Sequence, residues 1–113
     1  MADTKHIQIT ITDNSPEVIS AAKNAIYRAL WAVGATAEGY AKQDAPVDTG
    51  RLRNSITHKE TQDQTIIGTN VEYAIYQELG TSRGVKPKHF LKNAVADHSD
   101  EYKRIIEDSF KNV

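Results

Sequence analysis

The sequence predicts an α+β fold, in which a small antiparallel β-sheet packs against a long N-terminal helix and a C-terminal helix. Two observations predict this class. Short runs alternate between apolar and polar residues, as half-buried strands do, and two long stretches repeat apolar residues every three to four positions, as amphipathic helices do. The order of these segments lacks the strand–helix alternation of a parallel sheet. Because a chain of 113 residues has the usual size of one domain, residues 1–113 are predicted to form a single domain.

The first predicted element is a strand over residues 5–12, followed by a helix. Ile7, Ile9 and Ile11 alternate with polar residues, which is typical of a half-buried strand. Ser15 is a favourable N-cap, and Pro16 suits the first helical position. We therefore expect a helix to begin at about residue 16.

This helix is expected to continue to about Asp44. Tyr27 and Trp31 fall away from the centre of its apolar stripe, and Gly34 lies in its interior. An interior glycine marks either a close crossing or bend, or a tolerated surface position, and the sequence leaves both open. The predicted stripe consists of Val18, Ala22, Ile26, Leu30, Val33, Ala37, Tyr40 and Ala41.

The central part of the chain predicts a turn and a β-hairpin. Pro46 disfavours helical geometry in the residue before it and so ends the helix. Asp48 is expected to cap a short turn through residues 50–53. The strand-like runs Ser55–Thr61 and Gln64–Thr69 are then expected to pair as the hairpin, which the N-terminal strand joins in the sheet.

The last part of the chain predicts a short helix, a loop and a long helix. Residues 71–79 form the short helix, which Gly80 closes in a left-handed conformation. Residues 80–88 form an open basic loop, and a final helix is expected from about Lys88 to Asn112. Its predicted apolar stripe consists of Leu91, Ala94, Val95, His98, Tyr102, Ile105, Ile106 and Phe110.

The chain has few large apolar residues. Ile, Val, Leu and Phe make up 24 of its 113 residues, or 21%, which is just above the content at which chains fail to bury enough apolar surface to fold. We therefore expect neighbouring subunits to supply part of the burial. No apolar run is long enough for a bilayer, and the first residues lack the pattern of a signal peptide. The absence of cysteine excludes disulfides, thiol nucleophiles and iron–sulfur clusters.

No motif in the sequence predicts an enzyme, a cofactor site or a metal site. The four histidines lack the helical spacing of metal ligands. Residues 97–101 hold three acids and a histidine, but they fit the polar face of a salt-bridged helix with a packed His98. The segment from Gly80 to Gly84 lacks the Gly-Lys-Ser/Thr ending of a phosphate-binding loop. We therefore expect no catalytic residue.

A basic centre between two acidic ends is the clearest charge pattern. Residues 1–50 have a net charge of −2, residues 51–92 of +3 and residues 93–113 of −2. These basic residues either keep a loop soluble or meet phosphates or an acidic partner. The two clusters are Arg83, Lys86, Lys88 and Lys92, and Arg51, Arg53 and Lys59.

Three segments, at 45–56, 73–81 and 87–94, resemble the minor tail or head–tail joining proteins of long-tailed bacteriophages and prophages, also described as tail-completion or neck proteins. The resemblance covers about residues 16–96. The family usually has proline directly before Phe90, whereas this chain has His89 there and Pro87 two residues earlier. The positions that match the family are Asp48, Thr49, Gly50, Leu52 and Arg53 in the first segment, Tyr73, Tyr76, Glu78, Gly80 and Thr81 in the second, and Phe90 and Leu91 in the third.

The resemblance implies a non-enzymatic structural protein of the virion, at the head–tail junction or the tail end. It implies copies assembled as a ring of six, in contact with connector and tail proteins, made in the cytoplasm of the bacterial host and without a membrane. The matching residues serve either the fold or these contacts. The basic clusters face either another subunit or the genomic DNA in non-specific contact. The alternative function is a DNA-binding accessory protein that uses the basic clusters around residues 51–59 and 83–92.

Overall fold

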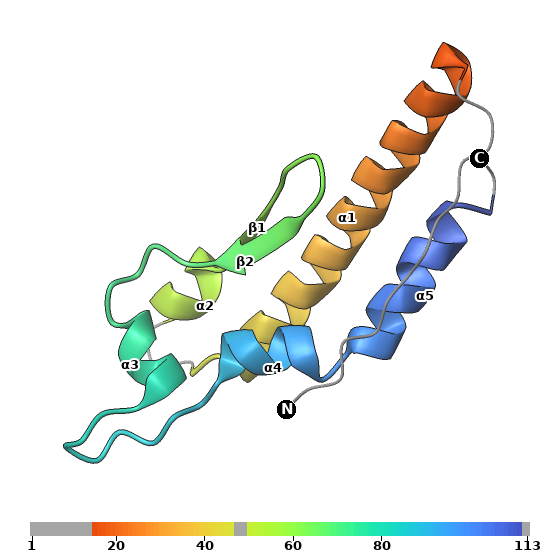
Figure 1. The fold of residues 1–113 in the computed structure, drawn as a ribbon. Coiled ribbons are helices and arrows are strands. Elements are labelled where there is room, and N and C mark those ends of the chain that lie inside the picture. Colours follow the sequence, from red (N-terminus) through yellow and green to blue (C-terminus); the bar gives the residue numbers. More distant parts are fainter. Residues whose placement is uncertain (1–14, 47–49, 112–113) are drawn as a thin grey trace.

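The computed structural model describes residues 15–46 and 50–111, and it confirms the α+β class. Figure 1 shows one long helix as the spine of the molecule, with a two-stranded hairpin on one side and the C-terminal helices on the other. The elements are α1 (Pro16–Asp44), α2 (Arg51–Ser55), β1 (Thr57–Glu60), β2 (Thr65–Gly68), α3 (Ala74–Leu79), α4 (Phe90–Ala96) and α5 (Ser99–Ser109). The predicted N-terminal strand at 5–12 and the predicted cap Asp48 lie outside the described residues.

The predicted boundaries of α1 are confirmed. The Ser15 hydroxyl accepts a hydrogen bond from the Val18 amide at 3.3 Å, which satisfies one of the unpaired donors at the helix start. At the other end Ala45 is extended, with φ −67° and ψ 141°, because the proline that follows disfavours helical geometry. Local sequence signals therefore set both ends of this helix of 29 residues.

The core lies along α1, which presents small side chains to its neighbours. The largest fully buried side chains, those of Leu52, Ile56 and Phe90, belong to one cluster near the C-terminal end of α1. A second cluster joins Val33 of α1 to Tyr102 of α5. Small residues on the helix let α4, α5 and the hairpin approach closely. The buried residues of α1 are Ala22, Ala25, Ala29, Val33, Gly34, Ala37 and Ala41.

The central hairpin is confirmed, with strands shorter than predicted. β1 and β2 are antiparallel, and His58 pairs with Ile67 and Glu60 with Thr65. The Thr61 amide donates to the Gln64 carbonyl at 2.9 Å and closes the turn. Since side chains alternate between the faces of a strand, the members of these two pairs share one face, which is the less exposed one.

The prediction of one continuous C-terminal helix from Lys88 to Asn112 is wrong. The chain forms α4 and α5 instead, with a break at Asp97 and His98, where His98 has φ −124°. Tertiary packing overrides the helical pattern here. The imidazole of His98 stacks on the Tyr40 ring, with centroids 3.5 Å apart. The Ala94 carbonyl, which a continuous helix would pair with the His98 amide, accepts a hydrogen bond from the Tyr102 hydroxyl.

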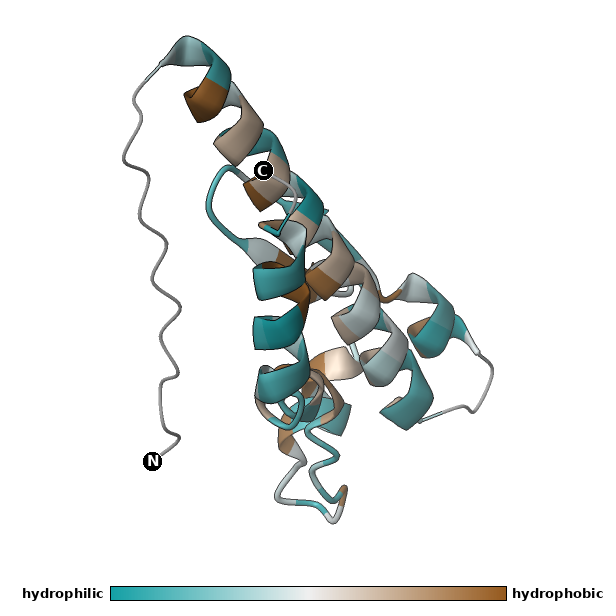
Figure 2. Ribbon diagram, turned by 90° about the vertical axis from the view of Figure 1, so that its right-hand side faces the viewer, coloured by the Kyte–Doolittle hydropathy of each residue, from teal (hydrophilic) through white to brown (hydrophobic). Residues whose placement is uncertain are grey.

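The break also changes which side chains the last helices bury. Ala94 and Tyr102 are buried as the stripe predicts, and Phe90, which the stripe does not include, is buried as well. Val95, which the stripe includes, is 53% exposed. The two short helices have separate orientations, so a single stripe cannot run through both of them. The outer face of α5 is mainly hydrophilic (Figure 2).

Because of Tyr102, the stability of the protein is expected to depend on pH in the alkaline range. Burial raises the pKa of its phenol to about 12, with smaller contributions from the charges of Glu101 and Tyr40. The folded protein then holds this proton more tightly than the unfolded chain, whose phenol has the ordinary pKa of 10.0. We expect the free energy of unfolding to fall as pH rises from 10 to 12, as measured by urea unfolding at a series of pH values.

The control for this prediction is Tyr102→Phe, which removes the ionisable group and keeps the ring. Part of the slope should remain in this variant, because a hydrogen bond to Glu101 also raises the pKa of Tyr40. A slope identical to that of the unmodified protein would show that Tyr102 does not titrate with folding.

Candidate functional site

The residues that resemble the tail and head–tail joining proteins gather at one end of the molecule. This end holds α2, α3, the loop of residues 80–89 and the start of α4, beside the C-terminal end of α1 (Figure 1). The structure brings both predicted basic clusters toward this end. The exposed basic side chains there are Arg51, Arg53, Arg83, Lys86, Lys88 and Lys92, and Lys59 lies on β1.

The first segment forms α2 and its start. Gly50 precedes α2 with φ 80°, a left-handed conformation that favours glycine. Leu52 is only 2% exposed and packs in the main core cluster. The Arg51 guanidinium lies 5.6 Å from the centroid of the Tyr73 ring, a cation–π distance that links α2 to the start of α3. Asp48 and Thr49 lie outside the described residues.

Glu78 joins the second segment to the third. Its carboxylate accepts hydrogen bonds from the Leu91 amide at 2.8 Å and the Lys92 amide at 3.0 Å, in the first turn of α4. These amides have no partner within the helix, and the carboxylate also favours the positive end of the helix dipole. Glu78 therefore holds α4 in place and does not present a free charge. Its spacing from Phe90 in the sequence gave no signal of this role.

Removing this carboxylate is expected to destabilise the fold. We expect Glu78→Ala to lower the free energy of unfolding by about 1–2 kcal/mol, because two helix amides lose their acceptor. Glu78→Gln keeps one acceptor oxygen and should fall between Glu78→Ala and the unmodified protein in urea unfolding. Glu107→Ala is the control, since Glu107 is an exposed glutamate of α5. Equal stabilities of the alanine variants would contradict the capping role.

The loop of residues 80–89 is tied at its base. The Lys88 amide donates to the Gln77 carbonyl at 2.7 Å, and the His89 amide donates to the Glu78 carbonyl at 3.2 Å. Gly80 has φ 75° and ψ 178°, so its φ is positive as predicted, but its ψ differs from the left-handed helical value. A β-carbon on Gly80 would lie 2.7 Å from the Val85 carbonyl oxygen. Glycine is therefore required where the loop folds back.

His89 explains the departure from the family pattern before Phe90. Its φ is 50°, and it is the non-glycine residue with positive φ in the described part of the chain. Proline fixes φ near −65°, so the backbone of this loop cannot accommodate proline at position 89. Phe90 directly follows and is fully buried. The altered loop end therefore still places the phenylalanine in the core.

Large apolar side chains of α3 face the solvent. Ile75 and Tyr76 are each 56% exposed and Leu79 is 61% exposed, whereas Ala74 is the buried residue of this helix. Ile75 and Leu79 border a groove with a volume of about 340 Å³. The other lining residues are Gly68, Thr69, Val71, Glu72, Ala74, Glu78 and Leu91. Tyr76 is one of the motif residues predicted to serve either the fold or contacts, whereas no sequence pattern predicts the groove.

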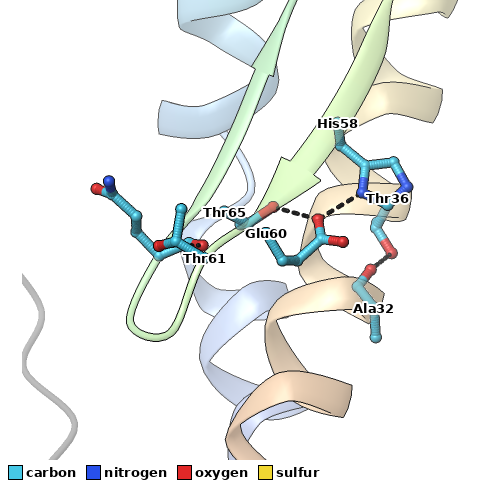
Figure 3. Close-up of polar contacts among 7 residues, drawn as sticks. Ala32, Thr36, His58, Glu60, Thr61 and Thr65 are labelled. Carbon is cyan, nitrogen blue, oxygen red and sulfur yellow. Dashed lines mark hydrogen bonds and ion pairs between the residues drawn. The ribbon is translucent and has the colours of Figure 1, made fainter.

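Gly34 marks a close crossing, which decides between the two interpretations of this glycine. It is buried, and a β-carbon there would lie 2.4 Å from Thr65 Oγ1, 2.7 Å from Glu60 Oε2 and 2.8 Å from His58 Nδ1. These side chains form a cluster in which Glu60 bonds to both others, at 2.6 Å to His58 and 2.9 Å to Thr65 (Figure 3). The missing side chain at Gly34 lets the hairpin lie against α1.

The groups of this cluster and of the α1–α5 contact serve packing. The Trp31 ring meets His58 edge-on, with centroids 5.6 Å apart. On the other side of α1, the Tyr40 hydroxyl donates to the Glu101 carboxylate. In residues 15–46 and 50–111, no group of three or more histidine, aspartate or glutamate side chains is arranged to hold a metal ion. No helix in these residues is long and apolar enough to cross a bilayer.

The comparisons with known proteins assign a family to this arrangement. Residues 13–80, which include α1, the hairpin and the start of the exposed loop, match the model of a family described as "Bacteriophage HK97-gp10, putative tail-component". No curated protein and no solved structure matches the chain. Because the match covers more than half of the 113 residues, the chain belongs to this HK97-gp10-like family of bacteriophage tail components.

Proposed function

We propose that this protein is a structural assembly protein at the head–tail junction or tail end of a phage particle, where its copies form a ring. The supporting observation is the distribution of apolar side chains between the interior and the surface among the described residues. Eight of the 14 buried apolar residues are alanine, whereas nine large apolar residues are exposed. Ile75, Tyr76 and Leu79 are neighbours on α3, and exposed apolar groups of this kind on soluble proteins usually mark surfaces that bind other proteins. A subunit that completes its burial in an assembly fits membership of a tail-component family.

Closure of a ring requires particular binding surfaces on each subunit. Each copy must offer two different surfaces that bind each other, because identical patches would close a dimer instead. Six copies are the number that the resemblance to head–tail joining proteins implies. Connector and tail proteins are the neighbours expected above and below the ring. In this role the protein works by contact and shape in the virion tail, and no reaction takes place on it.

The experiment that tests the role is electron microscopy of particles made without this protein. We expect finished heads and tails that fail to join, or tails of uncontrolled length. Either result requires a virion component acting late in assembly, and the two results separate a junction role from a tail-end role. Normal, infectious particles would overturn the proposal.

Contact with DNA is the second candidate function, favoured by the basic loop. Arg83, Lys86, Lys88 and Lys92 are exposed, and none of these side chains forms an ion pair with a carboxylate of the described residues. Unpaired basic side chains on one loop and the adjoining helix turn form a surface that attracts phosphates. The same loop would line the ring in an assembly protein and carry the binding in an accessory protein.

Affinity for duplex DNA across a salt series tests this second function. Phosphate contacts give a steep fall in affinity with salt, and reversal of Arg83, Lys86 and Lys88 to glutamate should remove most of the slope. The same triple variant separates the two placements of the loop in the particle. Normal oligomers with impaired genome passage favour a loop that faces DNA, whereas lost oligomers favour a loop between subunits. Weak, salt-insensitive binding by the unmodified protein would exclude the DNA function.

A further inference from the structure

Building on the proposed ring, we propose that the groove beside α3 in one copy binds Tyr27 and Trp31 of the next copy. The groove is defined by its lining residues Val71, Glu72, Ala74, Ile75, Glu78, Leu79 and Leu91, with Gly68 and Thr69 at its edge. Tyr27 and Trp31 are called the aromatic pair. The proposal names the two unlike surfaces that closure of a ring requires.

The volume and the apolar lining of the groove suit an apolar side chain. Its volume of about 340 Å³ is at the lower end of the range of ligand pockets. Val71, Ala74 and Leu91 supply apolar lining, while Ile75 and Leu79 stand exposed beside it. The Glu78 carboxylate is already bound to the amides of α4, so it does not compete for a partner inside the groove.

The aromatic pair has the form of an inserting surface. Tyr27 and Trp31 are one helical turn apart on α1, and they are 55% and 52% exposed. The Trp31 ring contacts His58 of the hairpin in a T-shaped arrangement, so its orientation is supported before any partner binds. Exposed tryptophan and tyrosine on a rigid helix are the residue types that dominate the energy of protein interfaces.

Charge complementarity favours a second copy as the partner. The charged residues that line the groove are both acidic, Glu72 and Glu78. Around the aromatic pair, Lys23 and Arg28 are exposed on the same helix, and Asp63 lines the depression beside Tyr27. Glu60 is bonded to His58, with a side chain only 6% exposed, so the accessible basic groups are Lys23 and Arg28. Insertion of the pair brings Lys23 of one copy toward Glu72 of the next. Opposite charges at the rim set the register of such a contact.

The two surfaces lie on different parts of the subunit. The groove is lined by residues of α3, the end of β2 and α4, whereas the aromatic pair lies at the middle of α1, where Trp31 contacts His58 of the hairpin. Tyr27 and Trp31 are fixed on the helix α1 and are 55% and 52% exposed, so both are open to a neighbouring copy. Each subunit therefore keeps one free groove and one free pair until neighbours on both sides occupy them.

A disulfide ladder tests this contact in the full-length protein. The chain contains no cysteine, so Lys23→Cys and Glu72→Cys in one chain add the only thiols. Oxidation at high protein concentration should link copies head to tail into covalent species larger than dimers. Each single-cysteine variant can reach a dimer at most. A double-cysteine chain that also stops at monomer or dimer would overturn the proposal.

Loss of the apolar contacts should abolish the ladder. In the double-cysteine chain we expect Tyr27→Ala with Trp31→Ala, or Leu79→Ser alone, to remove the larger species. Val95→Ala is the matched control, because Val95 is 53% exposed and lies in neither surface. Circular dichroism of each variant would check that it keeps its helices. A ladder that persists without the aromatic pair would contradict the proposal.

Mixing the variants gives a second, independent result. The variant without the aromatic pair retains a groove, and Leu79→Ser retains the pair, so a mixture has one working interface. We expect a heterodimer by light scattering and no larger species, and the absence of a heterodimer would count against the contact. If the ladder forms but particles made without this protein are normal, the role at the head–tail junction would be excluded while the contact between copies would stand. If no ladder forms but particles made without this protein are defective, the role in assembly would stand while the contact between groove and aromatic pair would be excluded.

Discussion

Phe90→Ala is expected to lower the free energy of unfolding by about 3–5 kcal/mol, the usual cost of deleting a buried phenyl ring. Phe90 is fully buried and belongs to the cluster that contains Leu52 and Ile56. It is also the first residue of α4, so its ring anchors this helix against α1. A small domain has a total stability of about 5–15 kcal/mol, and we therefore expect the variant to lose a large share of its stability and to unfold at a markedly lower temperature.

Thermal and urea unfolding followed by circular dichroism measure this effect. Val95→Ala on the same helix is the control, because a side chain that is 53% exposed should change stability by little. Phe90→Leu separates volume from aromatic character, since it keeps much of the apolar contact and should lose less. A loss below about 1 kcal/mol for Phe90→Ala would mean that the core closes around the missing ring and that α4 is held mainly by Glu78.

The parts of the fold that local sequence signals determine were predictable. The start of α1 depends on Ser15 and Pro16, and its end depends on Pro46, so neighbouring residues alone fix them. The hairpin was predictable because its runs are separated by a short polar turn. The strands are shorter than predicted because Ser55 ends α2, and because Thr61 and Gln64 form the hydrogen-bonded turn.

Features that depend on contacts between distant segments were not predictable. The helical pattern continues through His98, yet its stacking on Tyr40 and the Tyr102 hydrogen bond to Ala94 favour a break. The role of Glu78 likewise needs α4 in place before it can be recognised. The positions of these residues in the sequence do not show that His98 lies against Tyr40 or that Glu78 lies at the start of α4. The motif therefore identified Glu78 as a matching residue, but its role as the acceptor for the amides of α4 is visible only in the structure.

The motif residues divide between the interior and the surface. Leu52 and Phe90 are buried, and Gly50 and Gly80 have positive φ, so these positions serve packing and backbone geometry. Tyr76 is largely exposed, as are the basic side chains of the loop. A sequence pattern cannot separate these groups, because turn residues and contact residues share the same short segments. The exposed members are therefore the ones left to carry contacts with neighbours.

Gly34→Ala is expected to destabilise the protein, although alanine is the better helix former. Helix propensity alone would add about 1 kcal/mol of stability. The new β-carbon, however, would meet Thr65, Glu60 and His58 at distances of 2.4–2.8 Å. These side chains cannot move independently, because Glu60 bonds to both others and its side chain is only 6% exposed. Overpacking of this kind costs about 1–3 kcal/mol, so we expect a net loss.

Gly39→Ala provides the matched control for this prediction. It is the same substitution in the same helix, but a β-carbon at Gly39 would have no neighbour within 4 Å. We expect it to raise the free energy of unfolding by up to about 1 kcal/mol, so the two variants should differ in sign. Thermal unfolding of both proteins measures the difference. If Gly34→Ala were stabilised as much as Gly39→Ala, the hairpin would not lie against α1, because only that contact distinguishes the two glycines.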